Sequence, residues 1–208
     1  RASLMTGLLP HNHGVLQVEH VADADQCVLR ADKPHWAQRL QAVGYRTAYF
    51  GKWHIERSLR LADYGWEIGQ PLGQEQHRKL SEQGMRSDSA LDPDLTRYHA
   101  GPKGYNDTLH YGVTDVPLAE RGISKPTDAA VDFLADAPAD RPWCCVVSYY
   151  EPNEAMVVGR EAYSLYDVDN LALPANLRDD LDDRPNFYRR QQQIFAGLGD
   201  DEWRRALA

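Results

Sequence analysis

The stretch GYRTAYFGKWH, at residues 44–54, decides the fold. Its YRTAYF portion is rich in residues that favour a β-strand. The segment before it, residues 34–43, predicts a helix, because Pro34 suits a first helical position and apolar residues recur along one face (Trp36, Leu40 and Val43). Gly44 ends that pattern, and the strand follows at once. A helix followed directly by a strand is the repeating unit of an α/β fold.

The same order returns later in the chain. Thr127 can cap a helix, and WCCVVSYY follows at residues 143–150; the apolar residues of that helix are Ala130, Val131, Phe133 and Leu134. The WCCVVSYY run is apolar on both faces, as expected for a strand that helices cover on both sides. Two such units predict an α/β fold with a mostly parallel, doubly wound sheet flanked by helices.

The rest of the chain gives weaker signals. Residues 2–9 predict a short helix that ends at Gly7 and Pro10. Residues 57–125 are rich in Gly, Pro, Asp and His, with one plausible helix near residues 75–83. We interpret 57–125 as an insertion within one domain that spans residues 1–208. Near the end, a helical stripe and a last helix capped by Asp200 are expected (Phe187, Gln191, Ile194, Phe195 and Leu198; Trp203 and Leu207).

Composition narrows the function. The chain has 23 Lys and Arg residues against 31 Asp and Glu residues, a net charge of −8. This balance disfavours nucleic acids and anionic membranes as partners, because both need a basic surface, but a small anionic substrate stays compatible with it. No run of about 18 apolar residues predicts a membrane span. The three cysteines lack metal-ligand spacing, and the adjacent pair is expected to fill the core (Cys27; Cys144 and Cys145).

Three places carry residues suited to chemistry. Arg1 opens the first helix, and a guanidinium beside free backbone N–H groups suits a sulfate or phosphate. In GKWH, residues 51–54, extended backbone would point Lys52 and His54 to the same side, at the carboxyl edge of the sheet. EPNEA, residues 151–155, leaves the second strand at the same edge. Plainer explanations stay open for each place: a surface arginine, polar residues at a strand end, and a Pro-Asn turn.

Two motifs carry a family resemblance. Arg1 with the following ASLMTGLLPHNHGV resembles the first sulfatase signature, which runs Cys or Ser, any residue, Pro, Ser, Arg and then a helix ending in Thr-Gly. GYRTAYFGKWH resembles the second signature, about the expected distance downstream, and the similarity extends through DAAVDFL, WCCVVSYY and residues 160–208. The chain is thus similar to an internal part of a formylglycine-dependent sulfatase of the alkaline-phosphatase-like superfamily. The resemblance implies a partial sheet that lacks its N-terminal strand and the C-terminal part of the fold.

The resemblance also implies residue roles. The family's nucleophile, a Cys matured to formylglycine by a dedicated enzyme, precedes the motif's arginine by four residues and would lie outside this chain. Arg1 matches the arginine that steadies the nucleophile and the metal-site charge. Lys52 matches the lysine that contacts the sulfate and the nucleophile's oxygen. His54 matches the histidine that hydrogen-bonds the aldehyde hydrate and helps to break down the sulfated intermediate. One divalent cation, usually calcium, is expected, with ligands outside this chain, so no metal ligand is named within it.

One position departs from the family pattern. Many sulfatases have Pro-His after the second strand, and here Pro152 is followed by Asn153. Asn153 is a candidate substrate-binding residue, because an amide can hydrogen-bond an oxygen, yet it does not give up a proton at neutral pH. His99 and His110 are candidate replacements for the general acid, against the plainer interpretation that both are exposed loop histidines.

Three functions follow for the full-length protein. The leading expectation is hydrolysis of an aryl or carbohydrate sulfate ester, with attack of the hydrated formylglycine on sulfur. A phosphonate or phosphodiester hydrolase keeps the fold and the first signature. A non-catalytic binding protein on a sulfatase scaffold is the third, suggested by Asn153. The expected partners are a small-molecule or glycan sulfate ester and the maturation enzyme, and periplasmic, secreted and cytoplasmic locations all stay open.

Overall fold

The structure is a computed structural model that describes residues 1–17, 28–30, 32–72, 90–100, 107–150 and 156–208. The chain forms two compact units, a first unit of Arg1–Met85 with Leu118–Tyr150 and a second unit of Arg86–Pro117 with Glu151–Ala208. The first unit contains α1 (Ala2–Thr6), α2 (Pro10–His13), α3 (Trp36–Ala42), β1 (Arg46–Lys52), η2 (Leu61–Tyr64), β2 (Ile68–Leu72), η4 (Leu118–Glu120), α5 (Ser124–Ala135) and β5 (Trp143–Ser148). The second unit contains β3 (Leu91–His99), β4 (Thr108–Thr114), β6 (Met156–Gly159), α6 (Arg160–Tyr163), η5 (Val168–Asn170), α7 (Asn186–Phe195) and α8 (Asp200–Leu207).

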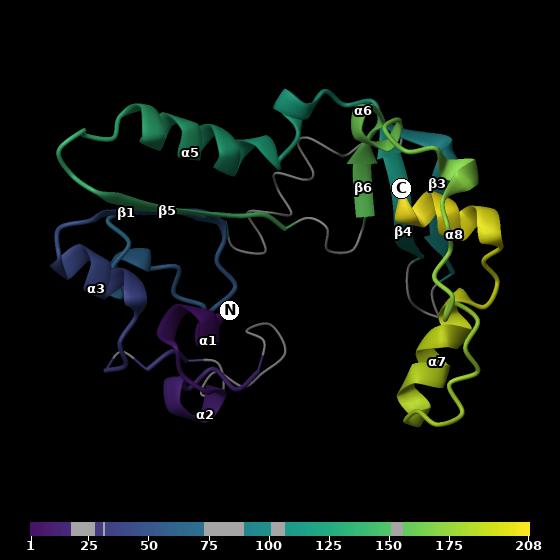
Figure 1. Ribbon diagram of the computed structural model, residues 1–208, viewed down its shortest axis with the longest axis horizontal. Coiled ribbons are helices and arrows are strands. Elements are labelled where there is room, and N and C mark those ends of the chain that lie inside the picture. Colours follow the sequence, from purple (N-terminus) through teal and green to yellow (C-terminus); the bar gives the residue numbers. More distant parts are fainter. Residues whose placement is uncertain (18–27, 31, 73–89, 101–106, 151–155) are drawn as a thin grey trace. The chain divides into compact units, whose positions relative to one another are not determined.

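A three-stranded parallel sheet forms the centre of the first unit. β1 lies in the middle and pairs in parallel with β2 on one side and with β5 on the other. Figure 1 shows α5 along one face of this sheet and α3 on the opposite face. Helices therefore cover both faces, which is the arrangement that buried parallel strands require. The predicted α/β fold with a parallel sheet flanked by helices is confirmed.

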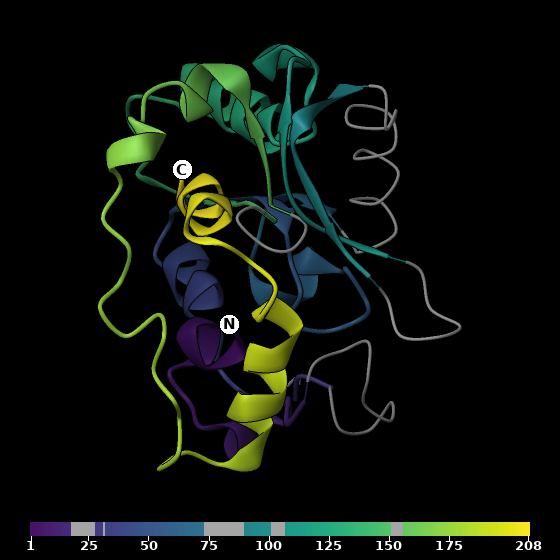
Figure 2. The ribbon, with the colours of Figure 1, turned by 90° about the vertical axis from the view of Figure 1, so that its right-hand side faces the viewer.

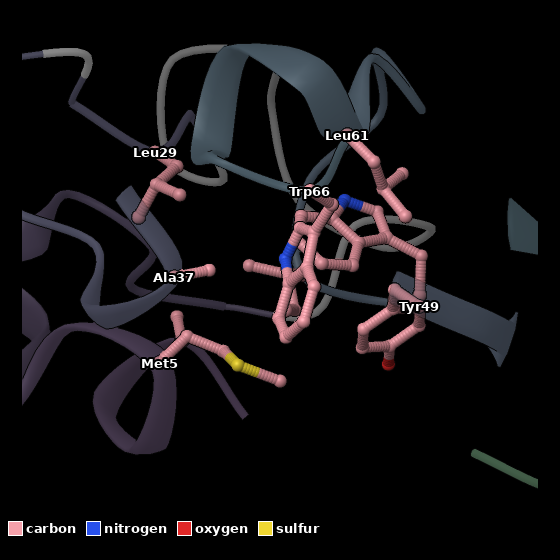
Figure 3. Close-up of a cluster of buried hydrophobic side chains, with 9 residues drawn as sticks. Met5, Leu29, Ala37, Tyr49, Leu61 and Trp66 are labelled. Carbon is pink, nitrogen blue, oxygen red and sulfur yellow. The ribbon is translucent and has the colours of Figure 1, made fainter. Parts of the chain in front are cut away.

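Alternate residues of β1 enter two separate cores. Tyr49 packs on the α3 side, whereas Ala48 and Phe50 pack on the α5 side with Ala130 and Phe133. Figure 3 shows the α3-side core, which Tyr49 shares with side chains from α1, α3, η2 and the turn before β2 (Met5, Ala37, Leu61 and Trp66). The two cysteines of β5 follow the same alternation, since Cys144 packs against the first core and Cys145 against the second. Their predicted role as small core residues is confirmed, while Cys27 lies outside the described residues.

Helix starts differ from the sequence-based expectation. α3 begins at Trp36, because His35 acts as the cap: its Nδ1 accepts from the Ala37 N–H at 3.4 Å, and its own N–H donates to Gln38 at 3.0 Å. Pro34 therefore lies before the helix. α5 begins at Ser124, so Thr127 stands inside the helix instead of capping it. The cap of α8 is Gly199, whose N–H donates to Glu202 at 3.0 Å, with Asp200 as the first helical residue.

The segment 57–125 contains strands that the sequence patterns did not reveal. β2 reads IGQPL, in which Gly and Pro hide the strand signal, and it pairs with β1 in the central sheet of the first unit. β3 has Asp and Pro residues directly after its first residue, Leu91, and β4 carries a glycine. Part of the segment thus belongs to the central sheet of the first unit, and the interpretation of 57–125 as an insertion within one domain stays a prediction. The helix expected near residues 75–83 lies outside the described residues, and a role of 57–125 in substrate recognition stays a prediction.

The second unit is built on a mixed sheet. β4 lies in the middle, antiparallel to β3 and parallel to β6. Figure 2 shows the paired strands β3 and β4 side by side. Arg160 at the start of α6 ties this sheet together, since its guanidinium donates to Asp92 and Asp115, each at 2.6 Å. Among the described residues, no helix combines the length and apolar character needed to cross a membrane.

Candidate active site

Arg1 links the start of α1 to the ends of two strands. Its Nη1 donates to the carbonyl oxygen of Lys52 at 3.1 Å and to Oγ of Ser148 at 2.5 Å. Lys52 ends β1 and Ser148 ends β5, so both acceptors lie at the carboxyl edge of the parallel sheet. Ligands of open α/β sheets bind outside this edge. The arginine predicted from the first motif and the lysine predicted from the second thus lie together, in the first unit.

Tyr49 reinforces the same strand end. Its hydroxyl donates to the carbonyl oxygen of Lys52 at 2.6 Å, so that this oxygen accepts from both Tyr49 and Arg1. The Tyr49 side chain is fully buried, and burial raises the pKa of its hydroxyl, while Ser148 and Arg1 act in the opposite direction. The hydroxyl stays protonated at neutral pH and remains a donor.

Gly51 allows the two strand ends to approach. It pairs with Ser148 in the parallel ladder and has a φ of 97°, in the region that favours glycine. A Cβ built on Gly51 would overlap the carbonyl oxygen of Ser148. The glycine is therefore required by both its backbone conformation and the neighbouring backbone.

The Lys52 side chain lies against an aromatic ring. Its Nζ is 4.5 Å from the ring centroid of Tyr150, within the range of a cation–π interaction. The residue is only 8% exposed. A lysine ammonium at this edge provides a positive charge for an anionic group.

His54 lies two residues after the end of β1. It is half-buried and has a φ of 49°, so the extended geometry does not continue to this residue. The condition for placing Lys52 and His54 on the same side by alternation is therefore not met, and the catalytic role of His54 stays a prediction. The flanking chain is well fixed, because the buried Glu56 accepts from Nε1 of Trp53 at 3.0 Å and from the N–H of Ser58 at 2.7 Å.

A buried histidine supports the helix that follows Arg1. Nδ1 of His13 accepts from the N–H of Val15 at 3.1 Å, so Nε2 carries the ring proton in the neutral form and faces Oγ of Ser3 at 3.0 Å. Burial lowers the pKa of His13, which favours this neutral form. The pair joins α2 to α1 and so stabilises the position of the helix start.

The remaining candidates are placed differently. Asn153 lies outside the described residues, so its role as a substrate ligand stays a prediction. His99 and His110 belong to β3 and β4 of the second unit, where both are half-buried. Their ring centroids are 4.5 Å apart, and both rings pack against Phe195. The interpretation as exposed loop histidines is wrong, because strand pairing and the cover of α7 enclose them; a role as general acid stays a prediction.

Three residues of this arrangement were missed by sequence reasoning, namely Tyr49, Ser148 and Tyr150. One signal was available for Ser148, because it is the polar last residue of an otherwise apolar strand that ends at the functional edge. Tyr49 and Tyr150 carried no such signal. An aromatic residue in a strand is ordinarily read as core, and Tyr150 follows another tyrosine.

No group of three or more His, Cys, Asp or Glu residues within the described ranges could hold a metal ion. The expected calcium ion stays a prediction about residues elsewhere.

Known proteins resemble this chain in sequence. The N-acetylglucosamine-6-O-sulfatase of Bacteroides thetaiotaomicron is 25% identical over 205 residues, which cover 98% of this chain and 30% of that protein. The uncharacterized sulfatase YidJ of Escherichia coli K12 is 26% identical over 171 residues, 76% of this chain and 31% of that protein. The chain thus spans about a third of the length of the curated relatives that it matches. No protein-family model matches it.

Solved structures share its fold. The phosphonate monoester hydrolase of Silicibacter pomeroyi aligns with a TM-score of 0.62 at 21% identity, covering 99% of this chain and 44% of that one. A protein solved in complex with its substrate, D-glucosamine-2-N,6-O-disulfate, aligns with a TM-score of 0.55 at 17% identity, covering 100% of this chain and 42% of that one. These two structures establish the fold, and the curated relatives match the sequence over most of its length. The chain is therefore similar in sequence to two curated sulfatases over most of its length, and it shares the fold of both solved structures.

Proposed function

We propose that the full-length protein hydrolyses an organic sulfate ester. The observation that carries the proposal is the attachment of Arg1 to the Lys52 carbonyl and to Ser148 at the carboxyl edge of the sheet. This attachment brings the arginine of the first motif to the lysine-bearing strand end of the second motif. Two curated relatives that carry the name sulfatase support the same reaction.

Each residue has a distinct part in the proposed reaction. Arg1 holds the start of α1 against the strand ends, and so fixes the chain next to a formylglycine nucleophile four residues upstream. Lys52 provides a positive charge that neutralises the sulfate oxygens as the S–O bond to the alcohol breaks. His54 takes a proton from the formylglycine hydrate as the sulfated intermediate breaks down. Asn153 binds the ester through its amide. A divalent cation, expected to be calcium, would add positive charge when bound, through ligands outside the described residues.

The proposed substrate class is a sulfated amino sugar. One relative is named for sulfate at the 6-oxygen of N-acetylglucosamine, and one structural neighbour was solved with a 2-N,6-O-disulfated glucosamine. The net charge of −8 is compatible with a small anion if Arg1 and Lys52 provide local positive charge.

A phosphonate monoester is the alternative substrate. The phosphonate monoester hydrolase has the higher TM-score of the two structural neighbours, 0.62 against 0.55. Tetrahedral sulfate and phosphonate esters fit similar sites, so the fold does not separate them. The two ester classes differ in charge and reactivity, so kinetic measurements can distinguish a sulfatase from a phosphonate hydrolase.

The test compares a sulfate and a phosphonate ester of 4-nitrophenol, together with one sulfated amino sugar. Full-length protein, produced with a formylglycine-generating enzyme, is assayed with 4-nitrophenyl sulfate, 4-nitrophenyl phenylphosphonate and glucosamine 6-sulfate. Mass spectrometry of the peptide ending at Arg1 reports the state of the nucleophile. A kcat/KM for the sulfates well above that for the phosphonate supports the proposal. Preference for the phosphonate favours the alternative, and matured protein that hydrolyses none of the three supports a binding protein.

A further inference from the structure

The Lys52 ammonium and the Tyr150 ring come from neighbouring strands. Lys52 is the last residue of β1, and Tyr150 lies two residues beyond the end of β5. The parallel pairing of Gly51 with Ser148 brings the two strand ends together, and Nζ of Lys52 lies 4.5 Å from the ring centroid of Tyr150. The register of the sheet therefore sets this contact.

The contact limits the conformational freedom of the lysine side chain. A lysine side chain has four rotatable bonds, and ordering it costs roughly 2 kcal/mol of conformational entropy. An aromatic face that attracts the ammonium limits the positions open to it before any substrate binds. A charge that is held in place in the free protein needs less reorganisation when negative charge develops on a substrate.

The attraction depends on the ring and not on the phenol group. The ammonium lies over the face of the ring, where the negative charge of the aromatic quadrupole is concentrated. Phenylalanine has the same face, whereas leucine fills similar space without one. The two substitutions therefore separate the electrostatic contribution of the ring from simple packing.

We propose that Tyr150 is a positioning residue that holds the Lys52 ammonium over its ring, ready for the anionic group of the substrate. This inference rests on the proposed function, in which Lys52 neutralises the sulfate. Tyr150 acts through Lys52 and does not itself react.

The kinetic test uses full-length matured protein and 4-nitrophenyl sulfate. Tyr150→Leu is expected to lower kcat/KM roughly three- to thirtyfold, the range of an exposed to a desolvated cation–π contact. Tyr150→Phe is expected to retain most of the wild-type kcat/KM. In a Lys52→Ala background, Tyr150→Leu should cause no further decrease, because the two residues act as a unit. Tyr149→Leu is the matched control, since Tyr149 is the adjacent tyrosine and its hydroxyl faces Thr127 on α5 at 2.8 Å.

A second measurement does not need activity. Lysines are reductively methylated with ¹³C-formaldehyde, and the Lys52 resonance is assigned by its absence in Lys52→Arg. The ring current of Tyr150 should shift this resonance upfield in the wild type and in Tyr150→Phe, and the shift should vanish in Tyr150→Leu. If the shift behaves in this way while no ester is hydrolysed, the positioning stands and the proposed function fails. An unshifted wild-type resonance, or equal losses in the Leu and Phe variants, overturns the positioning.

Discussion

Tyr49 donates a hydrogen bond from its hydroxyl to the carbonyl oxygen of Lys52 at 2.6 Å, from a fully buried position in the same strand. Arg1 donates to this same oxygen at 3.1 Å. The carbonyl oxygen of Lys52 therefore accepts hydrogen bonds both from Tyr49, in the core of the sheet, and from Arg1, directly before α1. The hydrogen bond from Tyr49 fixes the end of β1, which carries Lys52, to the buried core.

Tyr49→Phe removes this bond and is expected to destabilise the protein by about 1 kcal/mol, the lower part of the range for a lost buried hydrogen bond, because Arg1 still donates to the oxygen. It should also lower kcat/KM a few-fold by loosening the end of β1. Thermal unfolding and kinetics measure the two effects. Tyr166→Phe is the control, since Tyr166 is 52% exposed. Equal Tm values for the two variants would contradict this role of the Tyr49 hydroxyl.

Gly51→Ala is expected to be far more damaging than Gly7→Ala. Both glycines have positive φ values, 97° and 70°, so each alanine carries a backbone strain of about 1 kcal/mol. Nothing lies within 4 Å of a Cβ at Gly7, whereas a Cβ at Gly51 overlaps the Ser148 carbonyl. Gly51→Ala should therefore cost several kcal/mol in total, as expected when backbone must move.

Soluble yield and Tm measure this difference. The Gly7 variant should fold with a modest decrease in Tm, while the Gly51 variant should be mostly insoluble or inactive. Similar Tm values for both variants would mean that the strand ends can separate without cost.

The sequence alone predicted the structure correctly where a local residue pattern determines a strand or the end of a helix. The β-forming residues of YRTAYF predicted a strand, the apolar run WCCVVSYY predicted a strand with two buried faces, and the paired strands β1 and β5 between two cores confirm both. Glycine at the end of α1 predicted its stop, and Gly7 is indeed left-handed there. In these cases the local pattern and the tertiary packing agree.

Contacts between distant segments were harder to predict. β2 has a weak local signal, and pairing with β1 makes it a strand. The left-handed backbone at His54 followed from no local pattern, and it removed the basis for pairing His54 with Lys52 by alternation. Tyr150 meets Lys52 because of the β1–β5 register, over a separation that single-sequence periodicity does not address.

His35 predicts how stability depends on pH. It is 1% exposed and surrounded by aromatic rings, its Nε2 has no hydrogen-bond partner, and burial lowers its pKa to about 4. In the unfolded chain His35 takes up a proton near pH 6.5, whereas in the folded chain it does so only near pH 4. Stability contributed by neutral His35 is therefore present above pH 6.5 and is lost as the pH falls from 6.5 towards 4, by about 2 to 3 kcal/mol.

His35→Asn tests this dependence, because asparagine keeps an N-cap acceptor for the Ala37 N–H and does not titrate. The variant should be less stable at pH 7.5 through lost packing, yet its stability should fall less steeply between pH 6.5 and 4. Exposed His11 provides the control substitution, His11→Asn, which should leave the slope unchanged. Parallel wild-type and His35→Asn curves of Tm against pH would show that His35 titrates equally in both states.

Lys52→Ala tests the charge at the carboxyl edge of the sheet. If Lys52 neutralises the sulfate oxygens in the transition state, its loss should lower kcat/KM for 4-nitrophenyl sulfate by about 10²- to 10³-fold, as for removal of one stabilising group from a preorganised site. Lys125→Ala removes the same charge from an exposed position of α5 and should change the rate less than about twofold, because surface charges are screened. Lys52→Arg keeps the charge but not its compact geometry and should give an intermediate rate. Because Lys52 is mostly buried, a Tm within a few degrees of the wild type is needed to assign the loss to chemistry and not to unfolding. A folded Lys52→Ala protein with nearly full activity would remove Lys52 from the reaction and leave the sulfate charge to other groups of the full-length protein.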